Sequence, residues 1–236
     1  MSDVVLLPVF NEEATVGEVL DSVRRYFDGD ILVVDDGSTD GTVDVLAARR
    51  DVSVITHPEN LGYGRALAEG FSVARVRGAR RVITMDCDGQ HEPAHIPEFL
   101  RTLDRGHDIV SGSRYLPESI AVGTAPAERR EVNARVTAEI NRVTGWAITD
   151  SFCGFKAYRT AALEGMVLTE PGYAMPLELW AKAYRRGLAI TELPIERIYC
   201  DHDRSFGEAL DDPERRFAYY MQVWHSALGE GEVQGA

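Results

Sequence analysis

Short apolar runs alternate with longer amphipathic stretches along the first half of the chain. Four runs have the length of buried strands, over 4–9, 31–34, 52–56 and 82–85. In the stretches between them, apolar residues recur every three or four positions, which is the period of a helix with one buried face. The first stretch carries Val16, Val19, Leu20, Val23 and Phe27. Because the strands are apolar at nearly every position, the pattern predicts an α/β fold, a mostly parallel sheet with helices on both faces.

The second half of the chain is less regular. We expect a strand over 109–111, a loop over 112–128, helices over 128–144 and 175–186, a turn over 150–154, a strand over 190–195 and a last helix over 217–228. No linker or internal repeat interrupts this series. Residues 1–210 are therefore expected to form one domain, and residues 211–236 a helical extension.

The last predicted helix carries an apolar stripe of Phe217, Tyr220, Met221 and Trp224. Such a stripe can pack on the domain itself, on a second copy of the chain in a homodimer, or on a membrane surface. The opposite face of the helix is not basic, which makes peripheral membrane contact the least favoured of the three.

Composition narrows the classes of function. The 236 residues include 25 Lys and Arg against 38 Asp and Glu, a net charge of −13. This charge argues against nucleic acid as a partner, and an anionic substrate would need a metal ion or clustered arginines. No apolar run approaches the roughly 20 residues of a transmembrane span, and no signal peptide is evident, so a cytoplasmic location is expected. The three cysteines match neither a disulfide framework nor a zinc motif.

Acidic and amide side chains follow three of the predicted strands where each strand ends. They are Asn11, the pair Asp35-Asp36, and Asp86 with Asp88. Ligands of parallel α/β sheets bind outside the carboxyl ends of the strands, so these side chains are candidates for one site. Two carboxylates after a buried strand are costly to dehydrate unless a cation neutralises them, and Mg²⁺ and Mn²⁺ prefer such oxygen ligands. The same residue types also occur in ordinary turns and helix caps.

Several segments, taken together, are more specific than any of these pairs. They are Pro8-Val9-Phe10-Asn11-Glu12-Glu13, Val33-Val34-Asp35-Asp36-Gly37-Ser38-Thr39-Asp40-Gly41-Thr42, Asn60-Leu61-Gly62-Tyr63-Gly64, Met85-Asp86-Cys87-Asp88-Gly89-Gln90-His91, Gly112-Ser113-Arg114-Tyr115, Asp150-Ser151-Phe152-Cys153-Gly154-Phe155-Lys156, Glu178 and Glu192-Leu193-Pro194-Ile195. In this order, over roughly residues 3–208, the chain resembles family 2 glycosyltransferases, in particular the branch of the dolichol-phosphate mannose synthases. The resemblance implies the GT-A fold, that of nucleotide-diphospho-sugar transferases.

The resemblance also implies a site for a GDP- or UDP-linked sugar. Its nucleotide-sugar-binding residues would be Pro8, Phe10, Glu12, Asp35, Asp36, Asp86 and Arg204. Asp35 or Asp36 would accept a hydrogen bond from the base or the ribose, for which an acceptor-only carboxylate is suited. Asp86, Asp88 and Gln90 would hold the Mg²⁺ or Mn²⁺ that bridges the diphosphate and acts as a Lewis acid on the leaving group.

The implied catalytic residues are Asp88, Arg114 and Asp150. Arg114, and with less weight Arg130, would bind a phosphate-bearing acceptor, as guanidinium groups do well. Asp150 is either a base that deprotonates a hydroxyl acceptor or a cap for backbone N–H groups, because a phosphate acceptor is already ionised and needs no base.

The implied activity is that of an inverting hexosyltransferase, of mannose or glucose type, with a polyprenyl phosphate as the first acceptor. The alternatives are transfer to a hydroxyl of a sugar, protein or small molecule, and a catalytically silent protein that binds a nucleotide sugar. One departure from the family pattern weakens the prediction that the acceptor is a polyprenyl phosphate. After Gly207-Glu208 the related synthases commonly have Ser-Lys, whereas this chain has Ala209-Leu210, and then Asp211-Asp212, which would repel an anion.

One further motif is rejected. His91-Glu92-Pro93-Ala94-His95 has the letters of the zinc-protease helix motif. Proline is favoured in the first turn of a helix and not in its interior, so the two histidines would not share one helix face. We therefore expect no zinc site here.

Overall fold

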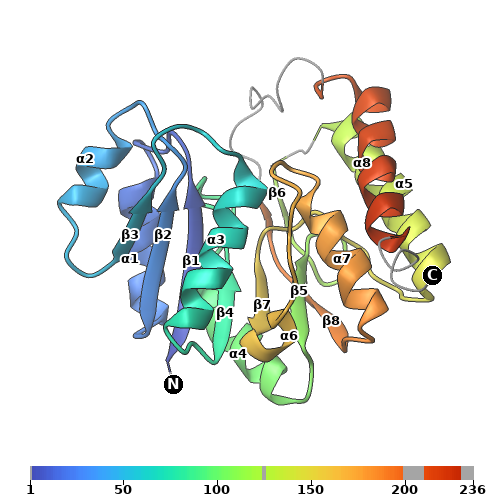
Figure 1. Ribbon diagram of the computed structural model, residues 1–236, viewed down its shortest axis with the longest axis horizontal. Helices are drawn as coiled ribbons and strands as arrows, with labels where there is room; N and C mark the ends of the chain where they lie inside the picture. The colour runs from blue at the N-terminus through green and yellow to red at the C-terminus, as the bar shows by residue number, and fades with distance from the viewer. Residues whose placement is uncertain (1, 124–125, 199–209, 230–236) are drawn as a thin grey trace, which may run out of the picture.

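The protein is built around one seven-stranded sheet (Figure 1). In the computed structural model, which describes residues 2–123, 126–198 and 210–229, the strand order is β3-β2-β1-β4-β7-β5-β8. β1 to β4 run parallel to one another, as do β5 and β8. The strands span Asp3–Val9 (β1), Asp30–Asp35 (β2), Ser53–Thr56 (β3), Arg81–Thr84 (β4), Ile109–Ser113 (β5), Lys156–Arg159 (β7) and Ile190–Pro194 (β8).

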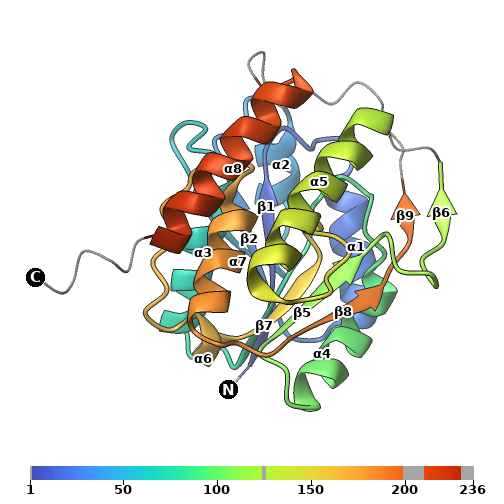
Figure 2. The same ribbon diagram turned by 90° about the vertical axis from the view of Figure 1, so that its right-hand side faces the viewer.

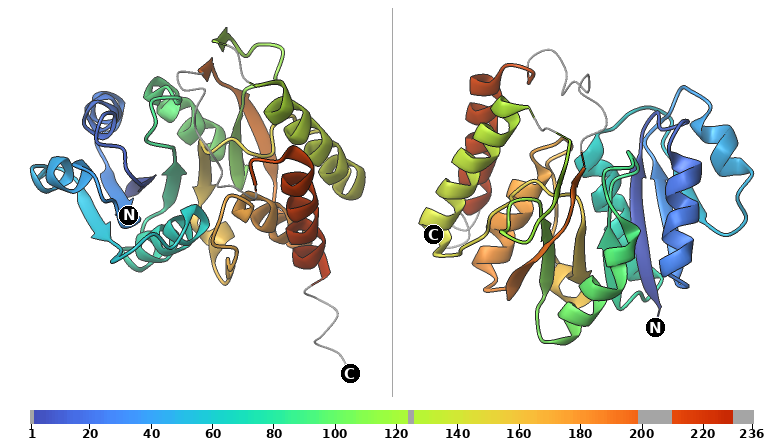
Figure 3. Two further views of the ribbon diagram at one scale, coloured as in Figure 1. Left: turned by 90° about the horizontal axis from the view of Figure 1, so that it is seen from above. Right: turned by 180° about the vertical axis from the view of Figure 1, so that it is seen from behind.

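Helices cover both faces of the sheet, as the view from above in Figure 3 shows. On one face Val5 and Leu7 of β1 share a core with α1, α2 and α4, and on the other Val4 and Leu6 share a core with α3, α5, α7 and α8. Successive residues of a strand face opposite sides, so a strand covered on both faces is apolar throughout. The predicted, mostly parallel α/β sheet is confirmed. The helices span Val16–Tyr26 (α1), Thr42–Ala47 (α2), Tyr63–Val76 (α3), Pro93–His95 (η1, a 3₁₀ turn), Ile96–Asp104 (α4), Ala127–Thr144 (α5), Thr160–Leu163 (α6), Met175–Arg185 (α7) and Pro213–Gly229 (α8).

The sequence pattern does not predict β7, which lies between β4 and β5 and is antiparallel to both. Lys156 and Arg159 stand at the two ends of β7 and leave only Ala157 and Tyr158 as apolar positions between them. Lys156 is buried nevertheless, because its ammonium donates to the carbonyl of Cys153 and lies 5.4 Å from the centre of the Trp180 ring. A hydrophobicity pattern counts such a lysine as polar, so it does not indicate that the side chain is buried against a carbonyl and an aromatic face.

The loop predicted over 112–128 contains a further short strand. This strand, β6 (Ala121–Val122), pairs in parallel with β9 (Arg197–Ile198), and the two form a separate small sheet beside the main one (Figure 2). The last helix, α8, begins at Pro213 and not at 217. The prediction of an uninterrupted loop was therefore wrong, and the start of the last helix lies earlier than predicted.

The C-terminal helix α8 packs against α5 and α7 and runs beside both in Figure 2. Tyr220 and Trp224 are 3% and 0% exposed, and the Tyr220 ring lies 4.7 Å from that of Phe152. Arg135 of α5 donates to Glu214 at 2.5 Å. The stripe thus covers the domain itself, the first of the three alternatives. No helix in the described ranges is long and apolar enough to cross a membrane.

We expect Trp224→Ala to lower the free energy of unfolding by about 3–5 kcal/mol, the usual cost of emptying a large buried aromatic site. The matched control is Gln222→Ala on the exposed side of α8, with an expected change within about 0.5 kcal/mol. Urea unfolding followed by far-ultraviolet circular dichroism measures both. Equal small losses in the two variants would show that α8 lies outside the cooperative fold.

Candidate functional site

The carboxyl ends of β1, β2 and β4 lie side by side at one edge of the sheet. β1 pairs with β2 on one side and with β4 on the other, and Val9 stands opposite Asp35. The loops that leave these three ends carry Asn11, Asp36 and Asp86. The topology therefore brings the predicted positions to one edge, where ligands of such sheets bind.

The loop after β1 is hydrogen-bonded to the loop after β2. The N–H of Asn11 donates to Ser38 Oγ at 2.9 Å, and Asn11 Oδ1 accepts from the N–H of Thr39 at 2.8 Å. The N–H of Glu12 donates to Thr42 Oγ1 at 2.8 Å. Asn11 takes a φ of +54°, a left-handed conformation that asparagine tolerates better than most residues. These bonds hold the two loops as one unit.

Three residues in or just after β1 were predicted to line a nucleotide pocket, and they differ in exposure. Pro8 is buried within β1, opposite Val34 of β2. Phe10 is 41% exposed, and Glu12 accepts from Thr15 Oγ1 at 2.7 Å. Phe10 thus presents an open aromatic ring on which a planar base can stack, whereas Pro8 lies inside the strand.

Asp35 is fully buried, yet one of its oxygens has no hydrogen-bond partner in the described part of the chain. Oδ1 accepts from the N–H of Ser38 at 3.1 Å, and Oδ2 is unpaired. A buried acceptor without a donor costs about 1–3 kcal/mol, and more for a charged group. Such an atom can accept from a water or from a ligand, and a base N–H or a ribose hydroxyl has the chemistry to donate to it.

Asp36 has the opposite environment, because both of its oxygens are paired. Oδ1 lies 2.6 Å from His57 Nδ1 and accepts from the N–H of Leu61 at 2.9 Å. Oδ2 accepts from the N–H of Gly62 at 2.8 Å. Asp36 therefore ties the segment between β3 and α3 to the end of β2. Of the two predicted acceptors, Asp35 is the one with an oxygen to spare.

His57 stands between two carboxylates. Its Nδ1 faces Asp36, and its Nε2 lies 3.0 Å from Glu69 of α3. Ionised carboxylates only accept hydrogen bonds, so both ring nitrogens carry protons and the ring is cationic. Burial lowers the pKa of His57, but its hydrogen bonds to Asp36 and Glu69 outweigh burial and raise the pKa overall.

Asp86 is half-buried at the end of β4 and is contacted from two sides. The hydroxyl of Tyr63 donates to Asp86 Oδ1 at 3.1 Å. His91 Nδ1 accepts from the N–H of Asp86 at 3.0 Å, and His91 Nε2 lies 3.8 Å from Asp86 Oδ2. Two residues further on, Asp88 Oδ1 accepts from the N–H of Gln90 at 3.0 Å across a turn. Asp86 and Asp88 thus lie on one short loop.

This loop fits a hard divalent cation. Asp86, Asp88 and Gln90 offer two carboxylates and one amide, which are oxygen donors throughout. Within the described ranges, no group of three or more His, Cys, Asp or Glu side chains is arranged to hold a metal ion alone. Mg²⁺ typically takes one or two protein carboxylates and completes its shell with substrate phosphates, and the donor set here matches that pattern.

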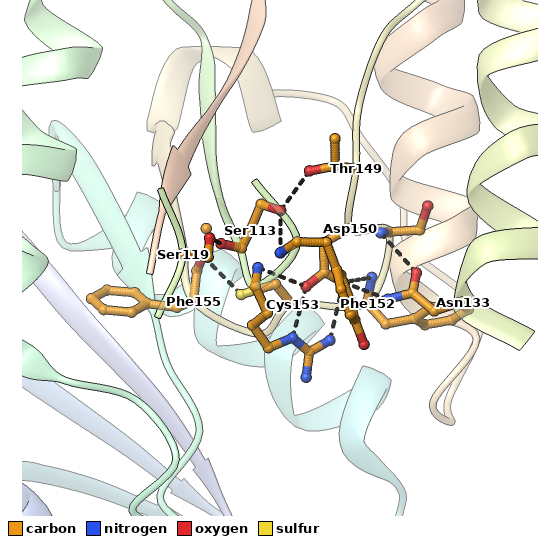
Figure 4. A network of polar contacts seen from close by, with 12 residues as sticks. Ser113, Ser119, Asn133, Thr149, Asp150, Phe152, Cys153 and Phe155 are labelled. Atoms are coloured by element: carbon orange, nitrogen blue, oxygen red, sulfur yellow. Dashed lines mark hydrogen bonds and ion pairs between the residues drawn. The ribbon is translucent and has the colours of Figure 1, made fainter. Parts of the chain in front are cut away.

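Another buried carboxylate, Asp150, is the centre of the network in Figure 4. Its Oδ2 accepts from Arg114 Nε at 2.7 Å, and its Oδ1 accepts from Arg114 Nη2 at 3.0 Å and from Asn133 Nδ2 at 2.8 Å. Burial raises the pKa of Asp150, but the charge and hydrogen bonds of Arg114 outweigh burial and lower the pKa to about 2. Asp150 also accepts from the N–H of Phe152 at 3.2 Å.

These contacts bear on the two roles that the sequence leaves open for Asp150. A carboxylate with a pKa near 2 and both oxygens paired is a poor proton acceptor at neutral pH. Its bond to the N–H of Phe152 is that of a cap. The geometry therefore runs against Asp150 as a general base and in favour of the capping role.

Arg114 keeps one nitrogen outside this ion pair. In the described part of the chain no residue accepts a hydrogen bond from its Nη1, and its side chain is 22% exposed. Arg130 lies exposed in the first turn of α5. Arg204 lies outside the described residues.

A family model matches the chain across these segments. The model described as Glycosyl transferase family 2 matches residues 4–166, well over half of the chain. The chain belongs to this family. The family predicted from the sequence is thereby confirmed.

Two relatives match most of this glycosyltransferase. Polyprenol monophosphomannose synthase of Mycolicibacterium smegmatis is 33% identical over 200 residues, which are 81% of this chain and 75% of that protein. Undecaprenyl-phosphate mannosyltransferase of Micrococcus luteus is 30% identical over 220 residues, 89% of this chain and 87% of that protein. Both names place them in the branch that the sequence resembles.

A solved structure matches the fold of this glycosyltransferase. It is that of glucosyl-3-phosphoglycerate synthase from Mycobacterium tuberculosis in complex with Mn²⁺, uridine diphosphate and glucosyl-3-phosphoglycerate. The match has a TM-score of 0.74 and 23% identity, and it covers 97% of this chain and 80% of that one. At this identity the similarity is one of fold, and it confirms the expected GT-A fold.

Sequence reasoning assigned no role to three polar residues, two of them buried and one half-buried, that support the site of this glycosyltransferase. His57 pairs with Asp36, and Asn133 with Asp150. Glu192 accepts from the N–H of Asp150 at 3.0 Å. Each contact joins residues at least 17 positions apart, so no local spacing signals it. Only Glu192 stands in a segment that carries the family resemblance.

From the raised pKa of His57 we expect the free energy of unfolding to depend on pH. A histidine whose pKa is raised in the folded state stabilises fully below its unfolded pKa of roughly 6.5, and this stabilisation is lost as pH rises through the folded pKa. Wild-type protein should therefore lose stability relative to His57→Gln as pH rises above about 6.5 and through the raised pKa of His57. Urea unfolding at each pH measures the difference. His225→Gln, at an exposed imidazole, is the matched control and should follow the wild type. Parallel curves for wild type and His57→Gln would contradict the cationic assignment.

Proposed function

We propose that this family 2 glycosyltransferase moves a hexose, of mannose or glucose type, from a nucleotide-diphosphate sugar to a polyprenyl phosphate with the help of Mg²⁺ or Mn²⁺. The observation that carries the proposal is the edge where β1, β2 and β4 end. An unpaired acceptor at Asp35 and an oxygen-only cation loop at Asp86 and Asp88 meet there. The names of the relatives from Mycolicibacterium smegmatis and Micrococcus luteus, both transferases to polyprenyl phosphates, support the acceptor.

On the donor side the described residues have roles that suit their environments, and the role of Arg204 rests on the family resemblance alone. Asp35 Oδ2 accepts from the base or the ribose, and the ring of Phe10 covers the base. Asp86, Asp88 and Gln90 would hold the cation, and Arg204 would contact the donor diphosphate. A bound Mg²⁺ or Mn²⁺ would neutralise the charge that develops on the departing diphosphate. Asp36 acts indirectly, by holding the segment that follows β3.

On the acceptor side the chain needs only a cation and no base. The Nη1 of Arg114 binds the acceptor phosphate, while Asp150 fixes the guanidinium from behind. A phosphate oxygen attacks the anomeric carbon, the bond from that carbon to the diphosphate breaks on the opposite face, and the configuration inverts. A hydroxyl acceptor would need a base, and the low pKa of Asp150 makes that residue a poor one. This favours a phosphate over a hydroxyl as acceptor.

The donor is tested by a thermal-shift screen of GDP, UDP and their hexose derivatives, each with Mn²⁺, with Mg²⁺ or with chelator. Binding to the folded state raises the free energy of unfolding by about 2.7 kcal/mol at a hundredfold excess over Kd. We expect one nucleotide to stabilise strongly with a divalent cation and only weakly in chelator. No metal-dependent shift with any nucleotide would overturn the proposed donor site. Transfer to a radiolabelled polyprenyl phosphate then separates an active enzyme from a silent binding protein.

Asp88→Asn should reduce metal-dependent transfer by about a hundredfold or more, because a catalytic cation contributes several kcal/mol and each 1.4 kcal/mol is tenfold in rate. Asp44→Asn, at an exposed carboxylate in α2, is the matched control and should keep wild-type activity. Initial rates over a range of Mn²⁺ concentrations measure both variants. Wild-type rates in Asp88→Asn would exclude this loop as the cation site.

A further inference from the structure

Tyr63 reaches the cation loop from another part of the chain. It is the first residue of α3, and its hydroxyl donates to Asp86 Oδ1 at 3.1 Å, across 23 residues of sequence. The donor and acceptor sites described above do not use it. It is nevertheless the one side chain outside the loop that, among the described residues, donates a side-chain hydrogen bond to Asp86.

The backbone around Tyr63 is fixed independently of any ligand. The N–H groups of Gly64 and Arg65 both donate to the carbonyl of Pro171, at 2.7 and 3.2 Å. Gly62 takes a φ of +103° and donates to Asp36, and a Cβ at Gly62 would overlap the Pro171 carbonyl. The direction in which Tyr63 leaves the chain is therefore set by the fold.

The ring of Tyr63 is fixed as well. It stacks on the ring of Tyr173, with 5.7 Å between the ring centres and an angle of 25° between the planes. Aromatic pairs of this kind contribute about 0.5–1.5 kcal/mol beyond the area they bury, which favours the observed ring orientation. The hydroxyl of Tyr63 is thus held in place before a cation arrives.

Asp86 is confined on its other side. A Cβ built on Gly154 would overlap both carboxylate oxygens of Asp86, so the carboxyl group lies directly against the glycine backbone. His91 Nε2 lies 3.8 Å from Oδ2. Between Gly154 and the Tyr63 hydroxyl, the Asp86 carboxylate has one orientation.

We propose that Tyr63 is a positioning residue for the divalent cation. Its hydroxyl binds one lone pair of Asp86 Oδ1 and fixes the rotamer of the carboxylate, which leaves the other lone pairs directed for the cation. This inference rests on the proposed function, in which Asp86 is a metal ligand. Groups that hydrogen-bond to a ligating carboxylate typically change metal affinity by about 10–100-fold when they are removed.

The test is Tyr63→Phe, which removes the hydroxyl and keeps the stack on Tyr173. Free Mn²⁺ is followed by electron paramagnetic resonance during titration of the protein, with a saturating concentration of whichever of UDP and GDP the wild type binds. We expect a Kd for Mn²⁺ about tenfold or more above wild type. The Kd for the nucleotide in chelator and the thermal midpoint in chelator should both stay at wild-type values. Tyr184→Phe, the same chemical change at a half-exposed tyrosine of α7, is the matched control.

Three results would overturn the proposal. The first is wild-type Mn²⁺ affinity in Tyr63→Phe. The second is an equal loss of thermal midpoint and of nucleotide binding in chelator, or failure of the variant to fold, because the hydroxyl would then be structural. The third is wild-type Mn²⁺ affinity in Gly154→Ala, which displaces the Asp86 carboxylate by an independent route. If wild-type protein itself binds no Mn²⁺ with either nucleotide, the proposed cation site fails together with this inference, whereas the first result alone leaves the proposed function intact.

Discussion

The sheet of this glycosyltransferase ends in carboxylates that are mostly hidden from solvent, and the structure depends on how each of them is neutralised. Asp36 is paired with the cationic ring of His57, and Asp150 with Arg114. Asp35 and Asp86 receive no cation of this kind among the described residues. Asp35 keeps an unpaired oxygen, and Asp86 accepts only the hydroxyl of Tyr63 at Oδ1. Removing a charge from water is costly without such partners, so the incompletely paired acids are the ones that we propose bind a ligand.

The paired and the incompletely paired acids divide the work of the site. Asp36 binds the N–H groups of Leu61 and Gly62, and this contact places Tyr63, which in turn contacts Asp86. Asp150, held by Arg114 and Asn133, fixes the turn before β7 in the same way. The structural acids thereby build the frame in which the ligand-binding acids are oriented. Losing a structural pair would disturb binding at a distance, because the frame connects them.

The sequence predicts the outline of the fold well. It does not predict which of the aspartates at the sheet edge are fully paired and which are not. The parallel strands and the covering helices have strong local patterns, since each buries an apolar face of its own. The sequence does not predict β7, because its buried Lys156 is stabilised by the carbonyl of Cys153 and the ring of Trp180. A local pattern can indicate neither contact. Asp35 and Asp36 are adjacent and chemically identical, so only the folded positions of His57 and Leu61 tell them apart. The pair of Arg114 and Asp150 spans 36 residues, and its effect on the pKa of Asp150 appears only in three dimensions.

The same ion pair connects charge to the choice of acceptor. The chain carries a net charge of −13, so an anion approaching the site is repelled overall and must be drawn in by local cations. Asp150 neutralises part of the charge of Arg114, yet it also holds the guanidinium rigid, with Nε and Nη2 facing inward. A guanidinium fixed in this way loses little conformational entropy when it binds one phosphate oxygen through Nη1. This small entropic cost offsets the weaker attraction that results from the partial neutralisation of Arg114 by Asp150. A carboxylate whose pKa that arginine lowers to about 2 is a weak base for removing a proton. The arrangement therefore suits an acceptor that arrives already ionised, and a phosphate does.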